Sequence, residues 1–381
     1  MELLYPGKRT FDDILKNTPI CSLKGKMAHK NMLIKGENLS VLQTLLHKYQ
    51  YHGKVDLIYI DPPFSTNTTF TMGNSRVSTV SKSNSDEIAY TDTLQGFQFI
   101  EFLRERLIIA KKLLSDFGSI YLHIDYKIGH YVKVIMDEVF GSCNFRNDIT
   151  RVKCNPKNFE RKAYGNIKDM ILFYSKTKDV IWNNPKLPFD DDDRRKLFKK
   201  TDKNGRAYTT IPLHAPGETK NGVTAKEFKG LKPPKGRHWR CAPDELEELD
   251  NAGLIEWSVN GNPRKIIYAD EKEGKKMQDI WEYKDPQYPL YPTEKNLDLL
   301  KAIVSASSNE NSLVMDFFCG SGTTLLAAQE LNRNWIGIDE SEKAIATSKE
   351  KLDQRPITLF HDNEYSYLEE HNPNNAVIKC V

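Results

Sequence analysis

The sequence lacks the patterns that mark several large classes of protein. Its 6 cysteines include no Cys-x-x-Cys pair, and its 9 histidines show neither HxxxH nor HExxH spacing. It contains no signal peptide and no apolar run long enough to span a membrane. These absences predict a reduced, cytoplasmic protein with no disulfide framework, no metal site and no membrane segment.

The chain also has little net charge, because its 55 basic and 52 acidic residues leave only +3. The charge is unevenly spread, however. Residues 151–240 hold 23 Lys or Arg against 10 Asp or Glu, which is a net +13 and leaves −10 for the rest of the chain. Aromatic residues such as Tyr164 and Trp239 are interleaved with the basic ones. This composition favours a polyanionic partner such as nucleic acid, and a solvated lysine-rich surface is the alternative.

Strand and helix patterns alternate on both sides of a middle region that lacks them. The expected strands are 31–35, 55–60, 119–124, 170–174, 312–316 and 334–339, and the expected helices are 11–16, 39–46, 94–114, 131–140, 296–305, 325–331 and 344–352. This alternation predicts an α/β fold with a parallel sheet. The middle region is rich in Pro, Gly and charge, so we expect a separate domain at 177–286, inserted between sheet halves at 1–176 and 287–381.

Three other stretches lack a clear pattern. Residues 65–85 are rich in Ser, Thr and Asn, which predicts a loop that is either a lid or surface slack. Residues 145–166 are basic and loop-like, and the tail beyond residue 352 is weakly patterned.

The first candidate site is Asp61-Pro62-Pro63-Phe64, which follows the apolar run 55–60. Two prolines stop a buried strand, so this tetrapeptide should form a rigid loop at the carboxyl edge of the sheet. A carboxylate, a prolyl carbonyl and an aromatic face complement an exocyclic amine on a planar base. A simple Asp-Pro turn after a strand is the structural alternative.

The second candidate site is a Gly-x-Gly turn between strand 312–316 and helix 325–331, followed by Asp339 at the end of the next strand. Strand, glycine turn, helix, strand and acid is the general scheme for holding an adenosine. The third glycine of the dinucleotide fingerprint is replaced by Leu325, which argues against a nicotinamide cofactor. S-adenosylmethionine, which has no pyrophosphate, fits better. If the strands before Asp61 and Asp316 are neighbours, a methyl donor and an amine acceptor meet at one sheet edge.

These motifs together resemble the beta-class amino-DNA methyltransferases, in which the catalytic half precedes the target-recognition region and the cofactor half comes last. The resemblance rests on residues 61–64 (DPPF), 291–295 (YPTEK), 316–324 (DFFCGSGTT) and 335–339 (WIGID). It extends to type II and type III modification enzymes of restriction systems, and 381 residues is short for a type III subunit. It implies a seven-stranded Rossmann-like methyltransferase sheet in permuted order, with an inserted target-recognition domain.

The resemblance also implies roles for residues. In the catalytic motif, Asp61 and Pro62 accept the adenine amine, Pro63 continues the rigid loop, and Phe64, in place of the more frequent tyrosine, stacks on the flipped base. The cofactor, S-adenosylmethionine, is expected to contact Glu37, Asp61, Thr293, Lys295, Asp316, Phe318, Cys319, Gly320, Ser321, Gly322, Thr323 and Asp339. Double-stranded DNA is expected to contact Lys153, Lys157, Arg161, Lys162, Arg237, Trp239 and Arg240.

The leading Asp61, in place of a serine, favours transfer to the N6 amine of adenine. N4-cytosine methylation is the main alternative, and methylation of RNA or of a protein amide is a further one, where the tetrapeptide more often begins with Asn. A DNA-binding regulator that only senses a ligand is the alternative outside enzymes. A cognate restriction endonuclease and a homodimer are possible partners.

Overall fold

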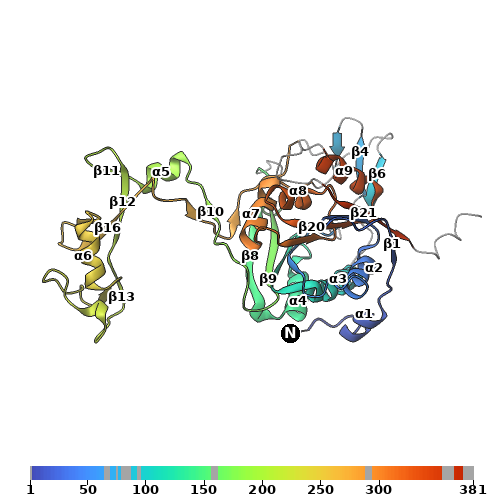
Figure 1. Cartoon of the computed structure of the whole chain (residues 1–381), viewed down its shortest axis with the longest axis horizontal. Coiled ribbons are helices and arrows are strands. Elements are labelled where there is room, and N and C mark those ends of the chain that lie inside the picture. Colours follow the sequence, from blue (N-terminus) through green and yellow to red (C-terminus); the bar gives the residue numbers. More distant parts are fainter. Residues whose placement is uncertain are drawn as a thin grey trace, which may run out of the picture. The chain divides into compact units, whose positions relative to one another are not determined.

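The computed structural model describes residues 2–63, 69–73, 76–78, 87–91, 96–155, 162–287, 294–353 and 364–371. The chain divides into two compact units (Figure 1). The larger unit joins Met1–Pro185 to Gln278–Val381, and the smaller unit is Lys186–Met277. The smaller unit is therefore an insertion in the larger one.

The larger unit is built on one ten-stranded sheet with the order β1-β21-β2-β20-β19-β3-β7-β9-β8-β18. In that order the strands are β1 (Ser22–Lys24), β21 (Ser366–His371), β2 (Met32–Lys35), β20 (Asn334–Asp339), β19 (Leu313–Asp316), β3 (Val55–Ile60), β7 (Leu114–Ile124), β9 (Lys168–Ser175), β8 (Phe145–Val152) and β18 (Ile280–Trp281). Neighbours from β21 to β7 are parallel, and β9 is antiparallel to β7 and β8. The predicted fold class is confirmed. The seven strands from β2 to β8 form the expected sheet, which β1, β21 and β18 widen.

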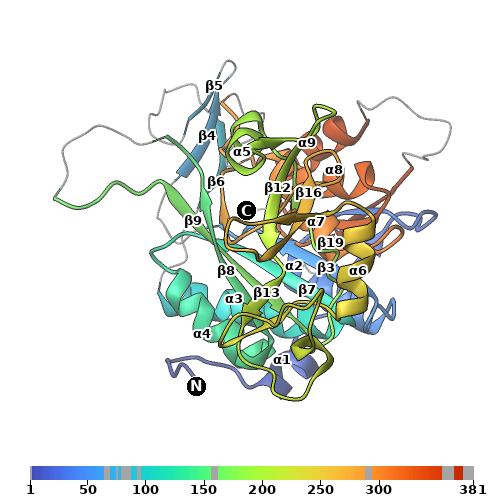
Figure 2. The ribbon, with the colours of Figure 1, turned by 90° about the vertical axis from the view of Figure 1, so that its left-hand side faces the viewer.

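Helices cover both faces of this sheet (Figures 1 and 2). One layer contains α1 (Phe11–Asn17), α2 (Asn38–His47), α3 (Phe97–Leu113) and α4 (Gly129–Phe140), and the other contains α7 (Leu297–Ser307), α8 (Thr323–Glu330) and α9 (Glu342–Asp353). A short 3-10 helix (Ser142–Asn144) follows α4. Ile58 and Ile60 of β3 belong to the main hydrophobic core together with side chains of α2, α3 and α4. Because side chains alternate along a strand, Tyr59 and Asp61 point to the opposite face.

The smaller unit has its own sheets and its own small core. Its sheets pair β10 (Lys186–Leu187) with β17 (Lys275–Lys276), order β11 (Lys200–Thr201), β12 (Ala207–Pro212), β16 (Pro263–Tyr268) and β15 (Ile255–Trp257) side by side, and pair β13 (His214–Pro216) with β14 (Arg237–Trp239). Its helices are α5 (Asp191–Leu197), α6 (Pro243–Asn251) and a 3-10 turn at Val223–Ala225. The core contains Leu213, Phe228, Trp239 and Leu246.

Three irregular stretches contain strands that the sequence did not predict. The stretch 65–85 includes β4 (Thr69–Gly73) and β5 (Arg76–Ser78), which form a small antiparallel sheet with β6 (Glu87–Thr91). The loop predicted at 145–166 begins with β8, and the tail supplies β21. Within the described parts of the chain, no helix is long and apolar enough to cross a membrane.

Candidate active site

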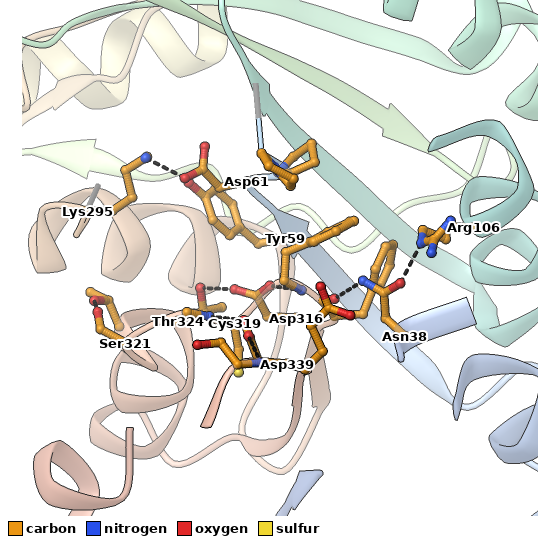
Figure 3. A pocket seen from close by; sticks show the side chains of 18 of the residues that line it. Asn38, Tyr59, Asp61, Arg106, Lys295, Asp316, Cys319, Ser321, Thr324 and Asp339 are labelled. Atoms are coloured by element: carbon orange, nitrogen blue, oxygen red, sulfur yellow. Dashed lines mark hydrogen bonds and ion pairs between the residues drawn. The ribbon is translucent and has the colours of Figure 1, made fainter. Parts of the chain in front are cut away.

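A cavity lies at the carboxyl ends of β3 and β19 (Figure 3). These strands are parallel neighbours, with Leu57 opposite Val314 and Ile58 opposite Met315, so the loops that follow them leave the same sheet edge. The cavity has a volume of about 290 Å³. Its lining comes from both halves of the chain and comprises Gly36, Glu37, Asn38, Tyr59, Asp61, Pro62, Pro63, Phe102, Arg106, Glu294, Lys295, Asp316, Phe317, Phe318, Cys319, Gly320, Ser321, Thr323, Thr324, Asp339, Glu340 and Ser341.

The two carboxylate oxygens of Asp61 differ in their contacts. Its Oδ2 forms an ion pair with Lys295 (Figure 3). Its Oδ1 is buried and has no hydrogen-bond partner among the described residues. A buried acceptor left unsatisfied costs about 1–3 kcal/mol, so this arrangement favours a ligand that brings a donor into the cavity. The rigid Pro62-Pro63 segment follows directly and also lines the cavity.

Two buried carboxyl groups shape the glycine turn after β19. Asp316 accepts hydrogen bonds from the Phe318 amide (3.0 Å) and the Thr324 hydroxyl (2.6 Å). Asp339 accepts from the amides of Gly320 (2.9 Å) and Ser341 (2.9 Å). These bonds tie the turn to the ends of β19 and β20. The shape of the turn is therefore fixed by bonds within the protein.

Burial raises the pKa values of these acids. The pKa of Asp316 rises to about 7 and that of Asp339 to about 6, although their hydrogen bonds act in the opposite direction. Burial also raises the pKa of the Cys319 thiol, with the charges of Asp339 and Asp316 adding to the effect. Cys319 therefore stays protonated at neutral pH and lines the cavity as a small neutral group.

Gly322 belongs to the glycine turn but does not line the cavity. It has φ +74°, a conformation that side chains rarely adopt, and it precedes α8 as the N-cap. A Cβ atom there would lie 2.7 Å from the Ser348 hydroxyl oxygen. That hydroxyl donates to the Gly320 carbonyl at 2.8 Å. Gly322 is thus required by backbone geometry and by close packing against α9.

On the opposite wall, the half-exposed carboxylate of Glu37 forms an ion pair with the buried Arg106. The Glu37 carboxylate caps α2 by accepting from the amides of Leu39 and Ser40, and it accepts from Arg106 Nη2 at 2.5 Å. Arg106 also donates to Asn38 Oδ1 at 2.5 Å. Sequence reasoning missed Arg106 and Asn38. The sequence indicates Arg106 only as an arginine on the apolar side of a helix, and such a residue can equally belong to a functional site or to a structural ion pair. It gives no indication of Asn38.

The remaining predicted cofactor residues are placed as follows. Lys295, Phe318, Gly320, Ser321 and Thr323 line the cavity. Lys351 of α9, which the sequence did not single out, donates to the hydroxyls of Ser321 (3.0 Å) and Thr323 (3.1 Å). Predicted residues Phe64 and Thr293 lie outside the described residues.

The predicted DNA contacts have mixed surroundings. Lys162, Arg237 and Arg240 are exposed. Lys153 Nζ lies 2.6 Å from Asp169 Oδ1 and is engaged in an ion pair inside the larger unit. Trp239 is only 1% exposed, and its indole N–H donates to the Lys226 carbonyl at 3.0 Å, so the prediction of a DNA contact for this side chain is wrong. It packs in the core of the smaller unit. Lys157 and Arg161 lie outside the described residues.

The fold and the cavity define a methyltransferase-like α/β enzyme, and comparison with known proteins identifies its family. Residues 55–350 match the N6/N4 methyltransferase family of DNA methylases, and the chain belongs to that family. It is 40% identical over 356 residues to the type II methyltransferase M.EcaI of Enterobacter cloacae, covering 91% of this chain and 76% of that protein. It is 28% identical to the Mod subunit of the type III restriction-modification enzyme StyLTI of Salmonella typhimurium, over 81% of this chain and 51% of that subunit.

Among solved structures, the crystal structure of the M1.HpyAVI-SAM complex is similar, with 19% identity and a TM-score of 0.42 over 84% of this chain and 99% of that one. The family match and the relative at 40% identity make the chain a modification methyltransferase that acts on DNA and uses S-adenosylmethionine. The cavity suits this cofactor, because its lining combines the carboxyl group of Asp339 with the cation of Lys295 and the rings of Phe102 and Phe318. Its volume is near the lower end of ligand cavities, which is about 300 Å³.

Proposed function

We propose that this chain methylates the N6 amine of adenine at specific sites in double-stranded DNA, on a base flipped out of the helix. The proposal rests on Asp61 Oδ1, which is a buried acceptor with no hydrogen-bond partner among the described residues. Asp61 lines the same cavity as the glycine turn. An exocyclic amine is the donor that this acceptor fits. The leading aspartate, in place of a serine, favours adenine over cytosine.

The chain's own groups would hold the amine in a reactive orientation. The amine of adenine is a weak nucleophile because its lone pair is delocalised into the ring. Acceptance of its two N–H groups by Asp61 Oδ1 and the Pro62 carbonyl would turn the lone pair out of the ring plane. Lys295 holds Asp61 Oδ2 in an ion pair, and a carboxylate oxygen can only accept hydrogen bonds. Bound S-adenosylmethionine supplies an electrophilic methyl group on a sulfonium.

Other residues would bind the DNA. We propose that Phe64 stacks on the flipped base, which returns about 1–3 kcal/mol of the cost of unstacking. The exposed side chains of Arg237 and Arg240 in the smaller unit, and of Lys162 in the larger unit, are our candidates for phosphate contacts. We further propose that the smaller unit, Lys186–Met277, recognises the target sequence. We also propose that the enzyme forms a homodimer and that a cognate restriction endonuclease is its partner in a restriction-modification system.

The modified base tests the proposal directly. DNA methylated by the protein would be digested to nucleosides and separated by mass spectrometry, and we expect N6-methyladenine. N4-methylcytosine as the only product would rule out the adenine assignment.

Asp61→Asn tests the role of the carboxylate. Because an amide can turn its NH2 group toward the substrate amine, we expect turnover to fall at least about 100-fold while the affinity for S-adenosylmethionine changes less than about twofold. The matched control is Asp56→Asn on the same strand, where the carboxylate accepts from the Ser115 hydroxyl at 2.9 Å outside the cavity. Equal loss of turnover and cofactor affinity in Asp61→Asn would mean that Asp61 is structural.

A further inference from the structure

A row of buried polar side chains crosses four neighbouring strands and begins at the cavity. The row consists of Tyr59 on β3, His123 on β7, Asp169 on β9 and Arg151 on β8. The Tyr59 hydroxyl lies 2.9 Å from His123 Nδ1, and His123 Nε2 lies 3.2 Å from Asp169 Oδ2. All four side chains are almost completely buried. Of the four, only Tyr59 lines the cavity, where Figure 3 shows it beside the motif that contains Asp61.

The far end of the row fixes the charge of Asp169. Lys153 Nζ lies 2.6 Å from Asp169 Oδ1, and Arg151 Nη1 lies 3.6 Å from Oδ2. Burial alone would raise the pKa of Asp169, but the hydrogen bond from His123 and the charge of Lys153 hold it well below its ordinary value. Asp169 is therefore an anion and can only accept hydrogen bonds.

This charge determines where the protons of the row lie. Because Asp169 accepts, His123 Nε2 must carry a hydrogen. Burial lowers the pKa of His123, so the imidazole is neutral and its Nδ1 is an acceptor. Burial raises the pKa of Tyr59, and the charge of Asp61 adds to that shift, so the phenol keeps its proton. The Tyr59 O–H must therefore donate to His123, which leaves only lone pairs on the phenol oxygen for other partners.

We propose that Tyr59 is a second hydrogen-bond acceptor in the cavity, and that His123 and Asp169 are positioning residues that keep its hydroxyl proton turned away from the ligand. The ligand group that it accepts from is an N–H donor. This group is either the ammonium of the methionine moiety of the cofactor or an N–H of the exocyclic amine of the target base, which Tyr59 would then share with Asp61 Oδ1 or the Pro62 carbonyl. The inference rests on the proposed function, because both donors belong to that reaction.

The direction of the hydrogen bonds along the row matters, because the hydroxyl of a neutral tyrosine can donate a hydrogen bond as easily as it accepts one. A donor pointing at an ammonium or an amine would repel it. In Asp169→Asn, the side-chain amide can donate to His123 Nε2, which favours the tautomer with the hydrogen on Nδ1. That hydrogen would occupy a lone pair of Tyr59 and turn the tyrosine proton toward the cavity.

The test is a double-mutant cycle with Tyr59→Phe and Asp169→Asn. We expect each single variant to lose about tenfold, either in the affinity for S-adenosylhomocysteine measured without DNA or in the single-turnover methylation rate at saturating cofactor. The double variant should be no worse than Tyr59→Phe alone, since Asp169 acts through the Tyr59 hydroxyl. Independent losses that multiply in the double variant would show that Asp169 is only structural.

The two measurements distinguish the two donors. A loss of affinity for S-adenosylhomocysteine assigns Tyr59 to the methionine ammonium. An unchanged affinity with a slower single turnover assigns it to the target amine. Tyr121→Phe is the matched control, because Tyr121 is a buried tyrosine on the neighbouring strand β7, bonded to the Ser307 hydroxyl at 2.8 Å, and does not line the cavity. We expect it to match the unmodified protein in both measurements.

A spectroscopic measurement keeps the test independent of folding and activity. The 15N shifts of the His123 ring, assigned with His123→Gln, should show hydrogen on Nε2 in the unmodified protein and a change in Asp169→Asn. If Tyr59→Phe matches the unmodified protein in affinity and rate while Asp61→Asn is inactive, the inference about Tyr59 fails and the proposed function survives. If Asp61→Asn remains active, the proposed function itself fails.

Discussion

At the scale of single residues, Asp316 shows how the site is held together at a cost in stability. Its carboxyl group is buried beneath the glycine turn and accepts from Phe318 and Thr324. Burial raises its pKa from 3.8 to about 7. Between these values the folded protein binds a proton that the unfolded chain releases. The contribution of Asp316 to stability is therefore fully present below pH about 4 and is lost as the pH rises to about 7.

This sign leads to a prediction for Asp316→Asn. The amide can still accept from Phe318 and can donate to the Thr324 oxygen, but it cannot ionise. Relative to this variant, the unmodified protein should lose about 1.4 kcal/mol of unfolding free energy per pH unit between pH 5 and 7, and nothing more above that range. Urea denaturation of both proteins at several pH values measures the difference. Two curves that stay parallel would show that Asp316 does not titrate in this range.

Cavity residues were easiest to predict from the sequence where the groups that act together lie in one short motif. Asp61 could be found because two prolines follow it directly, and the glycine turn because its spacing is local. Tyr59 and Arg106 could not be found, since their surroundings come from strands and helices far away in the chain. Trp239 was misjudged because an aromatic residue among basic ones is typical of a nucleic-acid contact and also of a small core.

At the scale of elements, the prediction succeeded for strands buried on both faces. The strand β3 runs over Val55–Ile60, as its apolar run indicates. By contrast, β8 has buried residues only near its end, and its polar residues gave the pattern of a loop. The strand β21 has two acidic residues and a histidine in its last three positions. Pairing decides both strands: β8 pairs with the next strand, β9, and β21 pairs with β1 and β2 from the start of the chain. The local pattern of either strand does not record that pairing.

The start of α8 gives a prediction about the turn as a unit. Gly322→Ala places a methyl group against the Ser348 hydroxyl at a positive φ, so both strain and a steric clash oppose it. We expect a loss of more than about 2 kcal/mol in unfolding free energy and weaker binding of S-adenosylmethionine. The measurements are urea denaturation and a cofactor titration.

Gly53→Ala separates these two effects. Gly53 has a similar φ of +68°, but a Cβ atom there would meet nothing within 4 Å. This control should cost only about 1 kcal/mol, the penalty of the backbone conformation, and should leave cofactor binding unchanged. Equal effects of the two substitutions would mean that packing against α9 contributes nothing to the turn.

At the scale of the whole molecule, the smaller unit begins and ends at neighbouring points. Its first and last strands, β10 and β17, pair with Lys186 opposite Lys276 and Leu187 opposite Lys275. Paired strands have Cα atoms about 5 Å apart. The chain therefore leaves the larger unit and returns to it through two adjacent strands, which is the geometry that permits an insertion without disturbing the host domain.

Removal of the smaller unit is the corresponding prediction. If residues 186–277 are replaced by a short Gly-Ser linker between Pro185 and Gln278, the remainder should unfold cooperatively and bind S-adenosylmethionine within about twofold of the full chain, because the cavity lies entirely in the larger unit. Sequence-specific DNA binding, measured by competition between DNA duplexes, should be lost. Retained specificity would place target recognition in the larger unit.

The position of β3 in the sheet also has a consequence for the growing polypeptide on the ribosome. One edge of β3 pairs with β7, which is made soon afterwards, and the other edge pairs with β19, which emerges only after the whole insertion has been translated. A nascent or truncated product that stops before β19 therefore exposes an unpaired central strand and lacks half of the cavity. Such a fragment would be inert toward DNA, and its open strand edge would favour aggregation.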